Sequence, residues 1–594
     1  MKRAFIALLF ALLILPDTVG AASLQTNVKT EGNSPEDGEA LSPVGSVPAL
    51  RPIEMQLKRG ASKQFDLRAL PARRPDPLER AQLDPPKHTP VEIGDSIEPP
   101  AAPPTPNAAA PAPNTVFEGL DREFWGSTSP SDATGDAGPD YYIQAVNSSV
   151  GIYDKTGNQQ AAFTFDTLMS QGSFGNLCDT DNAASPVVLY DTFEDRWVLT
   201  DVAYATDGGG NAIAPAFQCF AVSQTSDPLT GGWHFYSIQL NDFLNEYAKL
   251  AIWPDGIYMS ANMKGFGPGG VFANARAWAF NKRQMYAGSP TVQVVAFDIP
   301  GTDFAVMPSN ARLQTGTPPP GRPNLFLSTW LFTNAVTVYK FHVDWDRISL
   351  STFTGPDTPI SSTAWPNAAV ANAPQPGTAN LLNVVQLRAM VQNQYTNLGG
   401  VESLWIPHTV RRANTTGFAA PRWYQVDVTG GNVNPTIPQA ATWDPDGANV
   451  MHRFVPSLAL DRAGNLAMGY SISNATTMFP SIAYAGRLAS DPVNTFGQTE
   501  TMLFTGTASQ TTSTAWGEST SMSLDPDGCT FWYTNQYANP ADQTAAKRWK
   551  TKVGSFAYPS CVPAGAGGTV TGTVTVTPGG APISGATITF GARS

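Results

Sequence analysis

The sequence predicts an all-β protein whose main body is a β-propeller of six to eight blades. From about residue 116 onward, short β-type segments recur between clusters of Gly, Asp, Asn and Pro, with hardly any helical periodicity. Three stretches also share one pattern, an apolar strand, a polar turn and a second strand that carries aromatic residues: LAIW-PDG-IYMS, LALD-RAGN-LAMGYS and MSLD-PDG-CTFWYT. Such degenerate self-similarity at wide spacing is typical of propeller blades.

Length and composition agree with a large, turn-rich β protein. The chain has 594 residues, with 52 Gly, 51 Pro and only 14% charged residues, so more than one domain is expected. Its formal net charge is −12. An acidic chain without Lys/Arg runs argues against nucleic acid or an anionic membrane as a partner.

The N-terminus predicts export. In residues 1–21, Lys2 and Arg3 precede an apolar core, Ala4 to Leu15, and a small-residue site follows at Val19-Gly20-Ala21. The apolar run is too short to span a bilayer comfortably, although an uncleaved anchor is the alternative. We therefore expect a secreted or cell-surface protein with no membrane contact after signal cleavage.

Residues 22–115 are predicted to be a disordered Pro/Ala-rich leader and linker. They show little periodic apolar pattern, and Pro99–Pro113 has the composition of an extended, semi-rigid linker. Basic residues among Leu and Pro in 55–88 suggest a short docking motif as the alternative to a solvated leader.

The predicted body covers residues 116–561. Its clearest hairpin pairs Ser519–Leu524 with Cys529–Tyr537 across the turn Asp525–Gly528. At 40–60 residues a blade, about 445 residues allow six to eight blades. A two-sheet sandwich is the rival fold, but one unbroken β region of this length fits radial repetition better.

Four cysteines in an exported chain predict disulfides. Four allow three pairings, and the sequence alone does not choose. We favour Cys178–Cys219 and Cys529–Cys561, because each pair brackets one blade-sized segment. No CxxC or clustered His accompanies them, so we predict no metal site and no cofactor; a structural calcium ion at a propeller turn stays open.

The C-terminus reads as a linker, 562–568, and a partial β module, 569–594. Thr/Val alternation predicts a strand, and a Gly-Gly turn and a second strand follow. Two or three strands seldom stand alone, so this module is truncated or completes itself against something else.

Several blocks of the body resemble a family of secreted bacterial proteins with propeller-type folds. The resemblance implies fold and export and brings no activity with it. Both favoured cysteine pairs lie inside the matching blocks, which are VVLYDTFEDRWVLT (187–200), CFAVSQTSDP (219–228), YAKLAIWPDGIYMSAN (247–262), SIAYAGRLASDP (481–492), WGESTSMSLDPDGCTFWYTNQY (516–537) and KVGSFAYPSC (552–561).

Two further resemblances are more limited. Residues 568–591, with the core match GAPISGATI (580–588), are similar to the start of carboxypeptidase regulatory-like domains, which are Ig-like β-sandwiches. That name implies no peptidase activity here, because the chain has no HxxE or HExxH zinc motif. The Asp-Gly turns invite comparison with sialidases, but the Asp-box order is missing, so this is an analogy of fold only.

Candidate site residues come from the second half of the body. A glycosidase needs two carboxylates in different protonation states, and Glu402 and Glu518 lie in apolar or small-residue surroundings. Guanidinium groups suit recognition of an anionic sugar. The alternatives are interblade ion pairs, core tyrosines and buried histidines, and no Gly-x-Ser-x-Gly elbow is present. The candidate ligand-binding residues are Arg388, Arg453, Arg487, His408 and Tyr424.

The leading functional hypothesis is an extracellular binding or adhesion protein that recognises carbohydrate, a surface polymer or a surface protein. Export, the Pro-rich spacer, the low-charge β body and the C-terminal Ig-like strand pair motivate it. Aromatic side chains in the strands, such as Trp423-Tyr424 and Phe531–Tyr533, are its candidate binding feature, and the alternative is that these rings fill interblade cores. One alternative is a glycoside hydrolase or lyase of sialidase-like fold with Glu518 or Glu402 as acid/base. A second is a structural cell-surface scaffold. The hydrolase hypothesis predicts that Glu518 and the three arginines converge near the propeller axis.

Overall fold

A computed structural model describes residues 50–72, 108–299, 301–329, 334–365, 370–386, 388–412, 417–446, 450–541, 543–544 and 548–563. The chain divides into two compact units, Met1–Ala49 and Leu50–Ser594, and all described residues belong to the second. The predicted signal peptide (1–21) and the predicted C-terminal module (569–594) lie outside the described residues.

The second unit is a propeller of seven four-stranded antiparallel blades in the part of the chain that the structure describes. The predicted β-propeller is thereby confirmed, and its blade number falls within the expected range. The first four blades are β4–β7 (Thr134–Ala137, Tyr141–Val146, Ser149–Asp154, Gln159–Thr164), β8–β11 (Asn182–Asp191, Arg196–Thr206, Ala212–Ser223, Trp233–Leu240), β12–β15 (Phe243–Trp253, Gly256–Gly265, Phe272–Phe280, Thr291–Ile299) and β16–β19 (Met307–Asn310, Asn324–Ser328, Thr337–His342, Thr352–Asp357).

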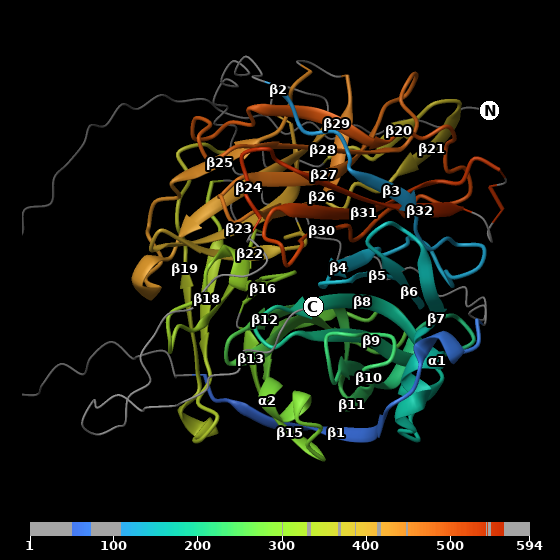
Figure 1. Cartoon of the computed structure of the whole chain (residues 1–594), viewed down its shortest axis with the longest axis vertical. Coiled ribbons are helices and arrows are strands. Elements are labelled where there is room, and N and C mark those ends of the chain that lie inside the picture. The colour runs from blue at the N-terminus through green and yellow to red at the C-terminus, as the bar shows by residue number, and fades with distance from the viewer. Residues whose placement is uncertain are drawn as a thin grey trace, which may run out of the picture. The chain divides into compact units, whose positions relative to one another are not determined.

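The remaining three blades close the ring. They are β22–β25 (Asn393–Leu398, Val401–Arg411, Ala419–Asp427, Gln439–Thr442), β26–β29 (His452–Leu460, Leu466–Ser473, Ser481–Arg487, Gln498–Phe504) and β30–β32 with β3 (Ser521–Leu524, Thr530–Ala538, Trp549–Ala557, Thr115–Glu118). The innermost strands contact one another in the order β4, β8, β12, β16, β22, β26, β30 and back to β4. Figure 1 shows most of them around the middle of the body, with β19, β25 and β29 further out.

The seventh blade joins the two ends of the body. Its outermost strand is β3, which comes from the N-terminal side of the chain and pairs with β32, Thr115 opposite Ser555. The predicted start of the body at residue 116 falls within this strand. Because hydrogen bonds between β3 and β32 hold the first and last parts of the body together, opening the ring requires breaking a sheet.

The recurring sequence pattern is the hairpin between the first two strands of a blade. It forms β12–β13, β26–β27 and β30–β31, as predicted. An aspartate directly follows β26 and β30, whereas Pro254 follows β12 and Asp255 comes next. Asp461 Oδ1, for example, accepts from the backbone N–H groups of Ala463 and Asn465, both at 2.9 Å. Short polar side chains that bond the following backbone are the usual turn formers.

The hydrophobic core lies between adjacent blades, so both faces of a blade are buried. In β31, Phe531 and Tyr533 pack in one interblade cluster, and Trp532 packs in another, because successive side chains point to opposite faces of a sheet. Trp423 and Tyr424 divide in the same way. These rings therefore fill interblade cores, which is the alternative to an exposed binding surface.

Part of the predicted leader is a strand, which corrects the expectation of disorder across 22–115. β1 (Ile53–Lys63) pairs with β15 and with β11, and so joins the outer edges of two blades (Figure 1). Ile53, Met55 and Leu57 alternate with polar residues, which is the strand period, and Leu57 is fully buried. Charged neighbours hid this alternation in the sequence.

Shorter elements complete the described chain. β2 (Ala108–Ala109) pairs with β29, and the hairpin β20–β21 (Ala373–Gln375, Thr378–Leu382) belongs to the long connection between β19 and β22. The described helices are α1 (Phe165–Met169), α2 (Lys282–Tyr286) and the 3-10 turns η1 (Leu67–Ala69), η2 (Ser170–Gly172), η3 (Leu177–Asp179), η4 (Leu313–Thr315), η5 (Ile348–Leu350) and η6 (Thr429–Gly431). Of these described helices, none is long and apolar enough to cross a membrane.

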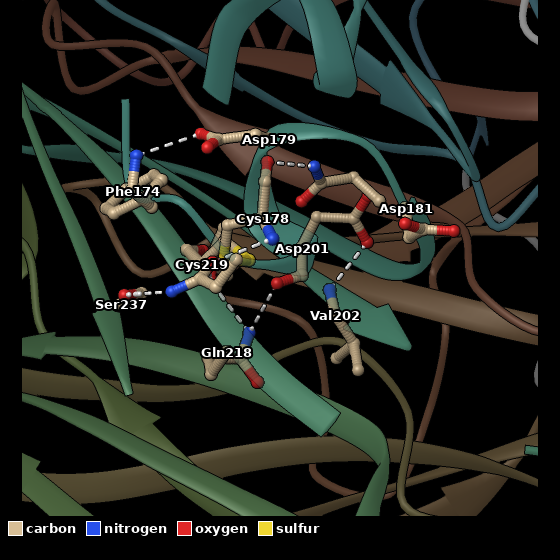
Figure 2. The surroundings of a disulfide bond; sticks show 12 residues. Phe174, Cys178, Asp179, Asp181, Asp201, Val202, Gln218, Cys219 and Ser237 are labelled. Carbon is tan, nitrogen blue, oxygen red and sulfur yellow. Dashed lines mark hydrogen bonds between the residues drawn. A yellow bond between two sulfur atoms is a disulfide. The ribbon is translucent and has the colours of Figure 1, made fainter. Parts of the chain in front are cut away.

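Both favoured disulfides are present. Cys178 in η3 bonds Cys219 in β10, with 5.8 Å between their Cα atoms; Figure 2 shows this bond beside Asp179, which accepts from the Phe174 N–H. Cys529 and Cys561 tie the start of β31 to the residues after β32. Stable disulfides fit an oxidising compartment, in agreement with the predicted export.

Candidate active site

The end of the ring at which the innermost strands begin has an unusual backbone. In six of the seven blades, a residue just before or within the innermost strand has a left-handed conformation, with φ between 49° and 56°. Non-glycine residues rarely adopt this region, and such outliers gather at functional sites. These six residues are Asp132, Ser185, Tyr247, Ala305, Val455 and Glu518.

Two of these left-handed residues, Asp132 and Glu518, are carboxylic acids in adjacent blades. Asp132 precedes β4 and Glu518 precedes β30, and these two strands contact each other. The Ser521 hydroxyl donates to the Gly135 carbonyl at 2.9 Å and ties the strands together just beyond the two acids. Both acids therefore lie at the same end of the ring, and neither is fully buried.

Lys249 adds a positive charge beside them. It lies in β12, is almost fully buried, and its Nζ donates to the hydroxyl of Ser519 at 2.9 Å. Its ammonium group also lies 4.3 Å from the ring centroid of Tyr247. Ser519 directly follows Glu518, so the lysine reaches from the third blade to the seventh across the channel mouth.

Arg388 is the second cation of the group and is 2% exposed. Its guanidinium carbon lies 4.8 Å from the Tyr247 ring centroid and 5.3 Å from that of Phe304. Nη2 is 3.8 Å from Glu246 Oε1, and Nη1 has no hydrogen-bond partner among the described residues. The other Glu246 oxygen accepts from Asn262 at 2.7 Å. We call Asp132, Glu246, Lys249, Arg388 and Glu518 the mouth cluster.

The mouth cluster has the electrostatics of an acid–base site. Loss of solvation raises the pKa of Asp132 well above its usual value, and the nearby Glu518 charge raises it further. Burial lowers the pKa of Lys249, against the pull of Asp132 and Glu518. Asp132 therefore holds its proton to a higher pH than an exposed aspartate does, which is the property of a general acid.

A small pocket lies between the innermost strands, next to Lys249 of the mouth cluster. Its volume of about 30 Å³ is enough for about two water molecules and too small for a sugar ring. Residues of β4, β8, β12, β16, β22 and β30 line it, among them Thr134, Lys249, Asn310, Asn393 and Ser521. A substrate would therefore lie over the mouth and not within the channel.

The far end of the pocket is closed by Arg312, which follows β16. Its guanidinium forms a buried ion pair with Asp136 of β4 and donates to the Leu524 carbonyl of β30 at 2.8 Å. The blade of β16 is not adjacent to those of β4 and β30 in the ring, so the side chain crosses the axis. Of the mouth cluster, Lys249 lines this pocket, together with Ser519.

Two long connections position Arg388 and Glu518. The segment that carries β20–β21 lies against the segment that leads into β30. Gln375 accepts from the Gln510 N–H at 2.7 Å and donates back to its carbonyl at 3.0 Å. The Asn383 N–H donates to the Thr514 carbonyl at 2.8 Å. These contacts fix the chain a few residues before each charged side chain.

Of the residues proposed from the sequence, the structure brings together Arg388 and Glu518. Glu402 lies elsewhere, in β23, where Arg322 binds it at 2.7 and 2.8 Å and the Tyr395 hydroxyl donates to it at 2.7 Å. Its oxygens are thereby used in contacts within the protein.

The remaining sequence candidates lie among structural contacts. His408 is buried, 3.3 Å from the Tyr424 hydroxyl, and burial and the nearby Arg422 charge lower its pKa well below the usual value. Arg453 binds Asp446 and Glu500 at 2.7–2.8 Å, and Arg487 donates to Gln439 and the Asp491 carbonyl. Asp132, Glu246 and Lys249 were not singled out from the sequence. Of these three, only Lys249 could have been identified from the sequence, because it is a charged residue within an apolar strand.

Comparison with known proteins identifies no family, because no family matches the chain and no curated protein does. Solved structures that share some likeness include an unknown-function protein from Dyadobacter fermentans (TM-score 0.31, 12% identity, 63% of this chain and 94% of that chain). A GH43_1 enzyme from Xanthomonas citri complexed with xylotriose has a TM-score of 0.26 at 12% identity, covering 63% and 88%. A structure titled for GH130 mannoside phosphorylases and hydrolases of Candida mannan has 0.25 at 11%, covering 65% and 87%. At such scores these likenesses carry no argument about function.

Proposed function

We propose that the propeller body is a glycoside hydrolase whose active site is the mouth cluster. One observation carries this proposal: Asp132 and Glu518 precede the innermost strands of adjacent blades, both in a left-handed conformation, and lie close enough for the Glu518 charge to raise the pKa of Asp132. Glycosidic bonds are cleaved by two carboxyl groups in different protonation states, and the environment of this pair separates their roles.

In the proposed reaction, Asp132 is the general acid and donates its proton to the leaving oxygen as the glycosidic C–O bond breaks. Glu518 is the carboxylate that attacks the anomeric carbon or takes a proton from the attacking water. If Glu518 attacks, water then breaks the glycosyl–Glu518 bond, adds its hydroxyl to the sugar and gives its proton to Asp132. If Glu518 takes the proton of the attacking water, it releases that proton to solvent, and Asp132 regains one from solvent. Lys249 and Arg388 balance the charges of Glu518 and Glu246 and can donate hydrogen bonds to sugar hydroxyls.

The binding-protein hypothesis loses its candidate binding feature, because these aromatic rings fill interblade cores. The hydrolase hypothesis gains from residues that it had not included. It required Glu518 and three arginines to converge near the propeller axis, but of these only Arg388 and Glu518 lie together. The proposal therefore now depends on Asp132 and Lys249 as well. The scaffold hypothesis relies on C-terminal strands that lie outside the described residues.

The test is turnover on a panel of neutral and acidic oligosaccharides and polysaccharides, with binding measured in parallel. We expect reducing ends to be released, and Asp132→Asn and Glu518→Gln each to reduce kcat by about 100-fold or more. Glu402→Gln is the matched control, because it neutralises a buried carboxylate outside the mouth cluster.

Binding without release would place the protein among carbohydrate-recognition modules and contradict the proposal. A product with an unsaturated sugar would indicate a lyase instead of a hydrolase. Unchanged turnover in both Asp132→Asn and Glu518→Gln would show that the active site lies elsewhere in the protein.

A further inference from the structure

Gln536 connects the two chain segments that end in the proposed catalytic acids. It lies in β31 and is fully buried. Its side-chain oxygen accepts three hydrogen bonds: from the Ser131 N–H at 3.0 Å, the Ser131 hydroxyl at 2.8 Å and the Gly517 N–H at 3.1 Å. Ser131 directly precedes Asp132, and Gly517 directly precedes Glu518.

The position of this oxygen determines where both acids sit. Asp132 and Glu518 have φ values of 50° and 51°, so each chain turns sharply directly after the bonded residue. A side chain attached to such a turn moves with the peptide group before it. One acceptor atom therefore sets the separation of two peptides that are far apart in the sequence.

A packing role alone does not account for this side chain. The NH2 group of Gln536 is buried without a hydrogen-bond partner in the described part of the chain, which is unfavourable for stability. Gln144, in the same interface between the first and seventh blades, uses both ends of its amide: it accepts from the Leu120 N–H and donates to the hydroxyls of Thr534 and Thr551. Only the acceptor of Gln536 is used, and it serves the two acid-bearing segments.

We propose that Gln536 is a positioning residue that fixes the spacing between the carboxyl groups of Asp132 and Glu518. This inference rests on the proposed function for its effect on turnover, but the spacing itself can be measured without a substrate. Gln536 touches neither carboxyl group and acts only through the backbone of Ser131 and Gly517.

Removal of the Gln536 acceptor should lower the pKa of Asp132. Gln536→Leu leaves two buried N–H groups unbonded, so the segments separate and admit water. Asp132 then feels less of the Glu518 charge and less desolvation, the two causes that raise its pKa, so its pKa falls. The other charged groups that face Asp132 are Glu246, Lys249 and Arg388, and all are unchanged in the variant.

The experiment compares the wild-type full chain with Gln536→Leu, Gln536→Glu and the control Gln144→Leu. Glu keeps an oxygen acceptor for all three donors but adds a negative charge. For Gln536→Leu we expect kcat to fall by about 10- to 100-fold with KM within about twofold, because misplacement of reacting groups costs about this much. The alkaline limb of the rate profile should move to lower pH, whereas in Gln536→Glu it should move to higher pH with much of kcat kept.

A second readout needs no turnover. The infrared carboxyl band that disappears in Asp132→Asn reports the titration of Asp132. The midpoint of this titration should shift to lower pH in Gln536→Leu and to higher pH in Gln536→Glu. Gln144→Leu should leave the midpoint and the pH profile unchanged, even if the protein melts earlier. An unshifted midpoint in folded Gln536→Leu and Gln536→Glu would overturn the inference, as would an equal shift in Gln144→Leu. Absence of wild-type turnover would instead refute the proposed function, and the infrared titration would still decide the role of Gln536.

Discussion

Arg312 and Asp136 form a buried ion pair that crosses the centre of the propeller, from the blade of β16 to the blade of β4. Their side chains are only 2% and 1% exposed. The second Asp136 oxygen accepts from the Tyr190 N–H at 2.8 Å, so the pair joins three blades. It closes the pocket at the end opposite the mouth cluster.

Breaking this pair should destabilise the whole ring. In Asp136→Asn the Arg312 charge stays buried without its counter-charge, and we expect a loss of about 3–5 kcal/mol in the free energy of unfolding. Denaturant unfolding measures this loss. The double variant Asp136→Asn/Arg312→Met should lose less than the sum of the two single changes, because the pair is removed as a unit. Additive losses would show that the two charges are not coupled.

Asp132 should make the protein less stable at neutral pH than at acid pH. Its folded-state pKa is raised by burial and by Glu518, so its stabilising contribution is present below the unfolded pKa of about 3.9 and is lost as pH rises through the folded value. Asp132→Asn is neutral at every pH. We therefore expect this variant to melt above the wild type at neutral pH, with the difference vanishing toward about pH 4. Equal melting temperatures at neutral pH would contradict the raised pKa.

Glu402 should matter for stability and not for chemistry. Arg322 holds it through two hydrogen bonds, and Tyr395 and the Gly430 N–H add two more. Glu402→Gln keeps the shape but weakens these charge-assisted bonds, so we expect a loss of about 1–3 kcal/mol. The kcat of the folded variant should stay within about twofold of wild type, because Glu402 lies outside the mouth cluster and its contacts affect only the free energy of unfolding. A selective loss of kcat without loss of stability would return Glu402 to the active site.

Features that the sequence predicted correctly involve residues near one another in the chain. The hairpins β12–β13, β26–β27 and β30–β31 each form within one stretch of alternating apolar residues and a polar turn. The cysteine pairs are separated by 41 and 32 residues and each brackets a few strands. Local periodicity and turn chemistry are sufficient to predict such features.

The candidate site could not be assembled in this way. Asp132, Lys249 and Glu518 belong with the first, third and seventh blades and Arg388 with the connection before β22, and only closure of the ring brings them together. The sequence separations between these residues do not indicate that they meet in the folded ring. The pattern of the strands also does not show which face of a blade is covered, so the sequence left open whether Trp532 and Trp423 are exposed or buried.

The strand β1 provides the last test, because the sequence predicts disorder where the structure has a strand that is paired on both sides. Leu57 pairs with Val292 of β15 and packs in the core between the second and third blades, whereas the neighbouring Gln56 is exposed. We expect Leu57→Ala to lower the free energy of unfolding by about 2–5 kcal/mol, and the matched control Gln56→Ala to change it by less than about 0.5 kcal/mol. Calorimetry of the two full-length variants measures the difference. If residues 53–63 were a solvated leader, neither change would affect unfolding, and the edges of β11 and β15 would need another cover.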